Sequence, residues 1–117
     1  MFHGAKERGT SELACNLGAL NPAERRAHDA LTKALIAAVS GRGETEDGYT
    51  FRIDKNRVTL AQVGEWIALE QRCCPFFDFR LDLRNDGVLT LALGGPEGVR
   101  EFIDAEFGFG ERASRAQ

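Results

Sequence analysis

The chain has 117 residues, 43% of them hydrophobic, which suits one compact domain with a single core. Its formal net charge is -3, and the 15 Lys and Arg residues are interleaved with 18 Asp and Glu residues, which argues against a nucleic-acid-binding surface. No apolar run approaches the roughly 20 residues of a membrane-spanning helix, and residues 1–12 lack the apolar region of a secretory signal. We therefore expect a cytoplasmic protein with neither a nucleic acid nor a membrane as partner.

The N-terminal part begins without a structural signal. Residues 1–12 are polar, contain glycine and show no periodicity, so we expect a flexible lead-in. In the next five residues Leu13, Cys15 and Leu17 alternate with two others, and this pattern allows a short edge strand.

The first helix is predicted from Pro22. Asn21 can cap its amides, and Glu24 stands where a capping box places an acid. Gly41 and Gly43 are expected to end the helix. Its apolar residues recur at three- and four-residue spacing, and they are Ala27, Leu31, Ala34, Leu35, Ala38 and Val39.

A strand and a second helix follow an acidic turn. Residues 48–54 alternate between apolar and polar side chains, which predicts a strand with one solvated face. Residues 58–73 return to helical spacing, and Pro75 is expected to end this helix because the residue before a proline is pushed out of the α region. The strand's apolar side chains are Tyr49, Phe51 and Ile53.

A hairpin and a third helix complete the pattern. Alternating segments on both sides of the turn residues Asn85, Asp86 and Gly87 predict two antiparallel strands. A last helix is expected to start near Pro96, and a polar flexible tail occupies 108–117.

These elements predict an α+β fold of two layers. An antiparallel sheet of three or four strands has one apolar face, and all three helices must cover that face to bury their own apolar stripes. The chain order favours a ferredoxin-like arrangement, with the second hairpin strand between its partner and the 48–54 strand. The segment 13–17 is the candidate fourth strand at an edge, and the single domain is expected to span 13–107.

Two adjacent cysteines, Cys73 and Cys74, lie at the C-terminal end of the predicted middle helix. With Cys15 they make three cysteines, which are too few and odd in number for a secreted disulfide framework, so we expect free thiols. The negative end of the helix dipole disfavours a thiolate nucleophile. A disulfide between neighbouring residues would close a strained ring, so a disulfide is disfavoured as well.

A soft metal ion fits these cysteines better, because its charge deprotonates the thiols that coordinate it. Glu70 lies three residues before Cys73 and four before Cys74, so its carboxylate is expected on the same helix face as the two thiols. There it can act as an oxygen ligand of the ion, or it can pair with Arg72 instead. Thiolates select Zn(II), Cu(I) or heavier thiophilic ions. The predicted site therefore consists of Cys15, Cys73 and Cys74 with Glu70 assisting, in a protein that binds or hands over a soft metal ion.

Two other functions stay open. Buried cysteine often behaves as a small hydrophobe, so the cysteines can be inert core residues of an interaction or homodimerisation module whose open sheet face meets a second copy. A thiol enzyme is the remaining alternative, but the sequence places neither His3 nor His28 near the doublet as a base. We assign His28 to a solvated helix face and expect no catalytic residue.

The segments "LACNLGALNPAERRAH", "DGYTFRI", "WIALEQRCCPFFDFRL" and "LALGGPEGVREFI" resemble a family of small uncharacterised bacterial proteins with an E-R-x-C-C-P-F type motif. The family is associated with heavy-metal, particularly mercury, resistance neighbourhoods, and the likeness covers about residues 13–107. It implies a thiol-metal theme. The family's doublet falls on Cys73 and Cys74, its early cysteine on Cys15 and its acid on Glu70, while Gln71 stands where a basic residue is expected.

Overall fold

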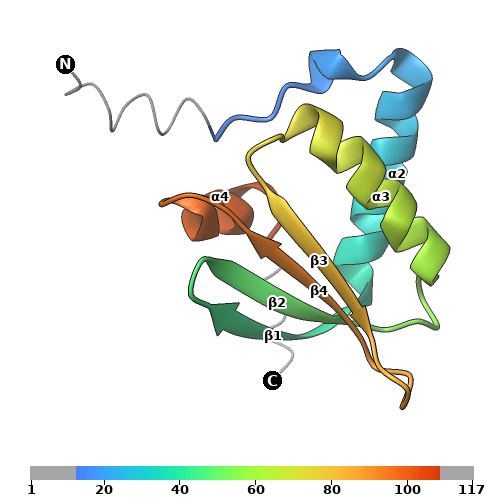
Figure 1. The fold of residues 1–117 in the computed structure, drawn as a ribbon. Helices are drawn as coiled ribbons and strands as arrows, with labels where there is room; N and C mark the ends of the chain where they lie inside the picture. The colour runs from blue at the N-terminus through green and yellow to red at the C-terminus, as the bar shows by residue number, and fades with distance from the viewer. Residues whose placement is uncertain (1–12, 109–117) are drawn as a thin grey trace.

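The computed structural model describes residues 13–108 (Figure 1). The predicted lead-in at 1–12, and all of the predicted tail except residue 108, lie outside the described residues. The described elements follow one another as η1 (Leu17–Ala19), α2 (Pro22–Ala38), β1 (Val39–Thr45), β2 (Gly48–Ile53), α3 (Leu60–Cys73), β3 (Asp78–Leu83), β4 (Leu89–Gly94) and α4 (Val99–Glu106).

The four strands form one antiparallel sheet in the order β1-β2-β4-β3. The α+β class with an antiparallel sheet is therefore confirmed, and β4 lies between β3 and β2 as predicted. The ferredoxin-like order is not confirmed, because the fourth strand, β1, pairs with β2 at the far edge of the sheet. Figure 1 shows β1 and β2 joined by a short turn at this edge.

The prediction that residues 13–17 form the fourth strand is wrong. The Asn16 side chain accepts a hydrogen bond from the Gly18 amide at 3.1 Å, which starts the 3-10 turn η1 instead of an extended segment. Strand β1 occupies residues that were predicted to end the first helix. The helix stops at Ala38, and Val39 has extended backbone angles, so the segment that contains Gly41 and Gly43 continues as a strand.

The core lies between one face of the sheet and the helices. Alternate residues of β2 and β4 point towards it, with Phe51 and Leu91 fully buried at the centre. All three α-helices contribute buried residues to the same cluster, which confirms that they share one face of the sheet. These residues include Leu35 and Ala38 from α2, Val63, Trp66 and Cys73 from α3, and Val99 and Ile103 from α4.

The opposite face of the sheet is polar. Arg52, Arg80, Asp82 and Thr90 line a shallow hollow there, together with Val88 and Ala92. Phe76, two residues before β3, lies on the core side, where it packs against Phe77 and Phe102 with ring centroids 4.7 and 5.0 Å away. Among the described residues, none of the helices has the length and apolar character needed to cross a bilayer.

Candidate thiol and metal site

The last turn of α3 carries the predicted site residues. The Cys74 amide donates a hydrogen bond to the Glu70 carbonyl at 2.7 Å, so helical geometry extends to the cap residue before Pro75 ends it. This geometry brings Glu70, Cys73 and Cys74 to the same end of the helix, as their spacing predicts. All three residues are fully buried.

The segment before α2 is held against this end of α3. The Asn16 amide donates to the Cys73 carbonyl at 2.7 Å, and the Arg72 guanidinium donates to the Ala19 carbonyl at 3.1 Å. Arg72 also binds both oxygens of Glu24, at 2.8 and 3.1 Å. These contacts place Cys15 above the doublet, which the sequence alone left open.

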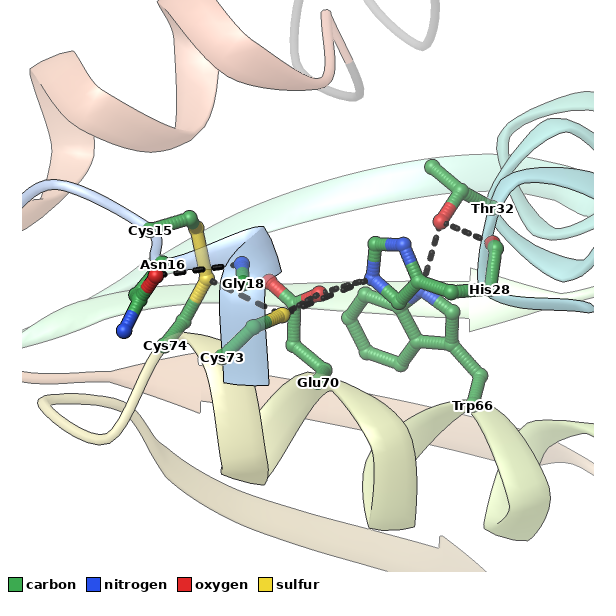
Figure 2. Close-up of a disulfide and its surroundings, with 9 residues drawn as sticks. All are labelled: Cys15, Asn16, Gly18, His28, Thr32, Trp66, Glu70, Cys73 and Cys74. Atoms are coloured by element: carbon green, nitrogen blue, oxygen red, sulfur yellow. Dashed lines mark hydrogen bonds and ion pairs between the residues drawn. A yellow bond between two sulfur atoms is a disulfide. The ribbon is translucent and has the colours of Figure 1, made fainter. Parts of the chain in front are cut away.

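Cys15 and Cys74 form a disulfide with their Cα atoms 4.6 Å apart (Figure 2). The expectation of three free thiols is therefore wrong, and Cys73 is the free cysteine of residues 13–108. The disulfide considered from the sequence joins the neighbours Cys73 and Cys74, whereas the bonded residues are separated by 59 positions. Cys15 is half-buried and Cys74 is fully buried, so only one side of the disulfide faces solvent.

His28 joins the site from α2, and its assignment to a solvated face is wrong. Its Nε2 lies 2.5 Å from Glu70 Oε1, and its side chain is 13% exposed. The sequence contains a signal for this position, since His28 precedes Thr32 by four residues and buried Leu35 by seven and so shares their side of the helix. Glu70 does not pair with Arg72.

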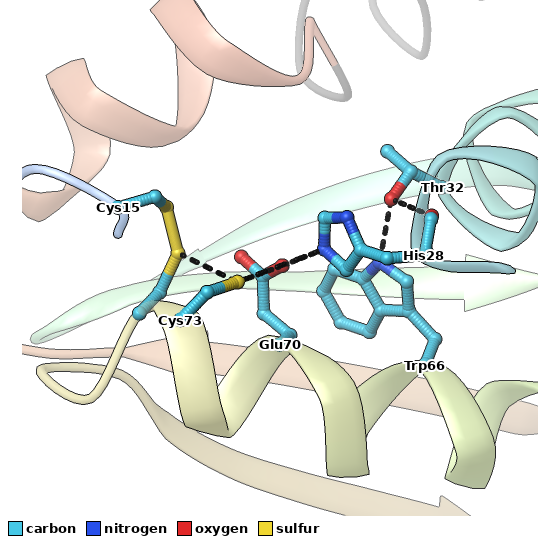
Figure 3. A network of polar contacts seen from close by, with 7 residues as sticks. Cys15, His28, Thr32, Trp66, Glu70 and Cys73 are labelled. Atoms are coloured by element: carbon cyan, nitrogen blue, oxygen red, sulfur yellow. Dashed lines mark hydrogen bonds and ion pairs between the residues drawn. A yellow bond between two sulfur atoms is a disulfide. The ribbon is translucent and has the colours of Figure 1, made fainter. Parts of the chain in front are cut away.

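The free thiol of Cys73 lies between the disulfide and this pair. Its Sγ is 3.9 Å from Cys74 Sγ and 4.0 Å from both His28 Nε2 and Glu70 Oε1 (Figure 3). Burial, together with the nearby Glu70 carboxylate, raises the pKa of Cys73 to about 11. The thiol is therefore protonated at neutral pH unless a cation displaces its proton.

A chain of hydrogen bonds connects the His28 backbone to Trp66 of α3. Thr32 Oγ1 donates to the His28 carbonyl at 2.7 Å and accepts from the Trp66 indole at 2.9 Å. Trp66 is fully buried. The chain ties α2 to α3 one turn from Glu70 and about two turns from Cys73, which fixes the separation of the two helices near the site.

Glu70 is shared by two groups of potential metal ligands. A carboxylate oxygen lies within 4.8 Å of Cys15 Sγ and Cys74 Sγ in one group, and within 4.8 Å of His28 and Cys73 in the other. Figure 2 shows one oxygen directed towards His28 and the other towards the disulfide. The buried Oε2 has no hydrogen-bond partner among the described residues, and such an orphan acceptor costs about 1–3 kcal/mol. Packing alone does not explain it.

No family model matches the chain, and no curated protein or solved structure shows a match to it. The family resemblance drawn from the motif therefore stays a prediction.

Proposed function

We propose that the chain, with its disulfide reduced, binds one soft metal ion through the thiolates of Cys15, Cys73 and Cys74. Glu70 adds an oxygen donor. The observation that carries the proposal is the convergence of three sulfurs on a buried carboxylate whose second oxygen has no hydrogen-bond partner in the described part of the chain. A cation at this point gives that oxygen a partner and offsets the burial of its charge.

The sulfur positions suit a tetrahedral ion. Zinc-sulfur bonds of about 2.3 Å at tetrahedral angles place two sulfurs roughly 3.8 Å apart. Cys73 Sγ and Cys74 Sγ are 3.9 Å apart before any ion is bound. Opening the disulfide takes two electrons and two protons from a thiol reductant, which is itself oxidised to a disulfide, and frees Cys15 and Cys74 as ligands.

The segment around Cys15 stays tethered when the disulfide opens. The hydrogen bonds from Asn16 to Cys73 and from Arg72 to Ala19 and Glu24 do not involve sulfur. They keep the third thiol near the doublet, so the ligands need little reordering to close around an ion. Soft thiolates favour Zn(II), Cu(I) or Hg(II), and the motif's association with mercury resistance makes Hg(II) one of the ions to test.

A thiol enzyme is less well supported than a metal site. In a nucleophile-histidine-acid triad the acid holds one ring nitrogen and the nucleophile meets the other. Here Glu70 and Cys73 approach the same nitrogen, Nε2 of His28, at 2.5 and 4.0 Å. The raised pKa of Cys73, about 11, further opposes a nucleophilic role at neutral pH.

The test is a titration of reduced, metal-free protein with Zn(II), Cu(I) or Hg(II). Thiolate-to-metal absorption is expected to saturate at one ion per chain, with release of protons. Replacing Cys73 or Cys74 by Ser should abolish tight binding of Cu(I) and Hg(II), and Cys15→Ser should weaken it. Glu70→Gln should weaken binding less than the cysteine variants do, because an oxygen donor adds little beside sulfur.

Glu65→Gln is the matched control, because Glu65 lies on the same helix but is exposed. Its metal affinity should equal that of the wild type. If the variant with both Cys73→Ser and Cys74→Ser binds as tightly as the wild type, the cysteines are packing residues and the interaction-module function replaces this proposal.

A further inference from the structure

We propose further that the disulfide-closed protein has its own metal site, in which His28, Glu70 and Cys73 bind a borderline divalent ion such as Zn(II) or Co(II). This inference rests on the proposed function, since it assigns the same pocket a different ion in each redox state. The reduced pocket offers three sulfurs, whereas the closed disulfide removes two of them and leaves one nitrogen, one oxygen and one sulfur donor.

The three remaining donors are arranged for one ion. His28 Nε2 and Glu70 Oε1 are 2.5 Å apart, and Cys73 Sγ is 4.0 Å from each of them. Tetrahedral coordination by these atoms needs separations of roughly 3.4 Å between nitrogen and oxygen and roughly 3.6 Å from sulfur to nitrogen. An ion therefore has to open the first distance by less than about 1 Å and shorten the others by less than about 0.5 Å, which side-chain rotation can supply.

The chemistry of the set determines which ions it takes. Imidazole, carboxylate and a single thiolate suit Zn(II) and Co(II) better than Cu(I) or Hg(II), which prefer several sulfurs. Three protein ligands leave a fourth coordination position for water or another small ligand. The reduced and the oxidised coordination sets share Glu70 and Cys73, so the pocket holds one ion at a time. Whether the Cys15–Cys74 bond is open or closed then determines whether that ion is a soft or a borderline one.

The three donors are held in place by the residues around them, and they can be reached from solvent. Glu70 and Cys73 are fully buried, while His28 is 13% exposed and provides the approach from solvent. The hydrogen bonds among Thr32, Trp66 and the His28 carbonyl hold the imidazole's helix in place. Figure 3 shows the imidazole, the carboxylate and the Cys73 sulfur directed towards one another.

The experiment titrates the protein with Co(II) while the disulfide is intact. One ion per chain should bind, with visible bands of tetrahedral cobalt and a thiolate-to-cobalt charge-transfer band. Cys73→Ser should lose the charge-transfer band, and His28→Gln should weaken binding by more than about tenfold, as expected when a metal ligand is removed. Zn(II) should compete for the site and slow alkylation of Cys73.

The matched control is the variant with both Cys15→Ser and Cys74→Ser, which cannot form the disulfide and lacks the two sulfurs of the reduced mode. It should bind Co(II) as the oxidised wild type does but lose tight Cu(I) binding. If the oxidised wild type binds no Co(II), or binds it without the charge-transfer band, this inference is overturned. Titration of the reduced wild type with Cu(I) or Hg(II) tests the proposed function separately. A failure of that proposal can therefore be distinguished from a failure of this inference.

Discussion

The Cys15–Cys74 disulfide should carry a large part of the stability of the closed protein. It joins residues separated by 59 positions. Closing a loop of that length removes about 14 cal/mol/K of entropy from the unfolded chain, which corresponds to about 4 kcal/mol at 25 °C. Domains of this size are stable by about 5–15 kcal/mol. Reduction should therefore remove a substantial fraction of the unfolding free energy and lower the melting temperature by roughly 15–30 °C.

Urea unfolding of metal-free protein with and without a thiol reductant measures this effect. Trp66, which is the sole tryptophan and is fully buried, reports unfolding through its fluorescence. Cys15→Ser should unfold at the same urea concentration with and without reductant, at the midpoint of the reduced wild type. Cys73→Ser keeps the disulfide and should stay sensitive to reductant.

The two variants make the argument refutable. A wild-type midpoint that is unchanged by reductant would show that the bond does not form or does not constrain the unfolded chain. A Cys15→Ser protein that remains sensitive would mean that a different pair of cysteines is bonded.

Three further predictions concern the same site and the open face of the sheet. Because the folded pKa of Cys73 is raised from 9.0 to about 11, the folded state favours the protonated thiol, so the unfolding free energy of the oxidised protein should fall as pH rises from 9 to 11. Urea midpoints across that range check this, and Cys73→Ser should show a smaller fall, which remains because burial also raises the pKa of Tyr49. Glu70→Met removes an orphan oxygen that costs about 1–3 kcal/mol and a hydrogen bond to His28 worth about 1.5–3 kcal/mol, so metal-free stability should change by only about 1 kcal/mol. Co(II) binding by the oxidised protein should be lost in this variant, and a loss of stability above about 3 kcal/mol would make Glu70 a structural residue. If the polar sheet face pairs with a second copy, light scattering should give twice the 12.9 kDa chain mass, and a mass of one chain at high concentration would contradict the homodimer.

Local patterns in the sequence were sufficient to predict most elements of the fold. Alternation identified β2 and the β3–β4 hairpin, and the capping residues Asn21 and Glu24 marked the start of α2. Strand β1 was missed because "VSGRGET" contains two glycines and no apolar alternation. It forms because the short turn after Thr45 brings it beside β2, and this pairing depends on a neighbouring strand rather than on its own side chains.

The site shows the same division between local and distant information. Helical spacing predicted that Glu70 shares a helix end with Cys73 and Cys74, because these positions lie within one turn. The contact from His28 to Glu70 spans 42 positions, and the disulfide from Cys15 spans 59. No periodicity within a helix can indicate which distant residue completes the site. The structure showed that the imidazole of His28 contacts Glu70 and that Cys15 is the disulfide partner of Cys74.

The Glu24 carboxylate takes part in two contacts, one at the start of α2 and one to α3, and this makes both of them sensitive to acid. Its Oε1 accepts from the Asn21 amide at 2.9 Å at the start of α2, and both of its oxygens bind Arg72 of α3. Hydrogen bonds from Arg72 and Asn21 hold the pKa of Glu24 below its usual value of 4.5. Their contribution to stability is fully present above pH 4.5 and is lost as pH falls through the lowered pKa, since protonation removes the charge that strengthens both contacts. A single protonation thus weakens the start of α2 and the contact between α2 and α3 together, while the Asn16–Cys73 hydrogen bond and the disulfide still hold Cys15 beside the end of α3.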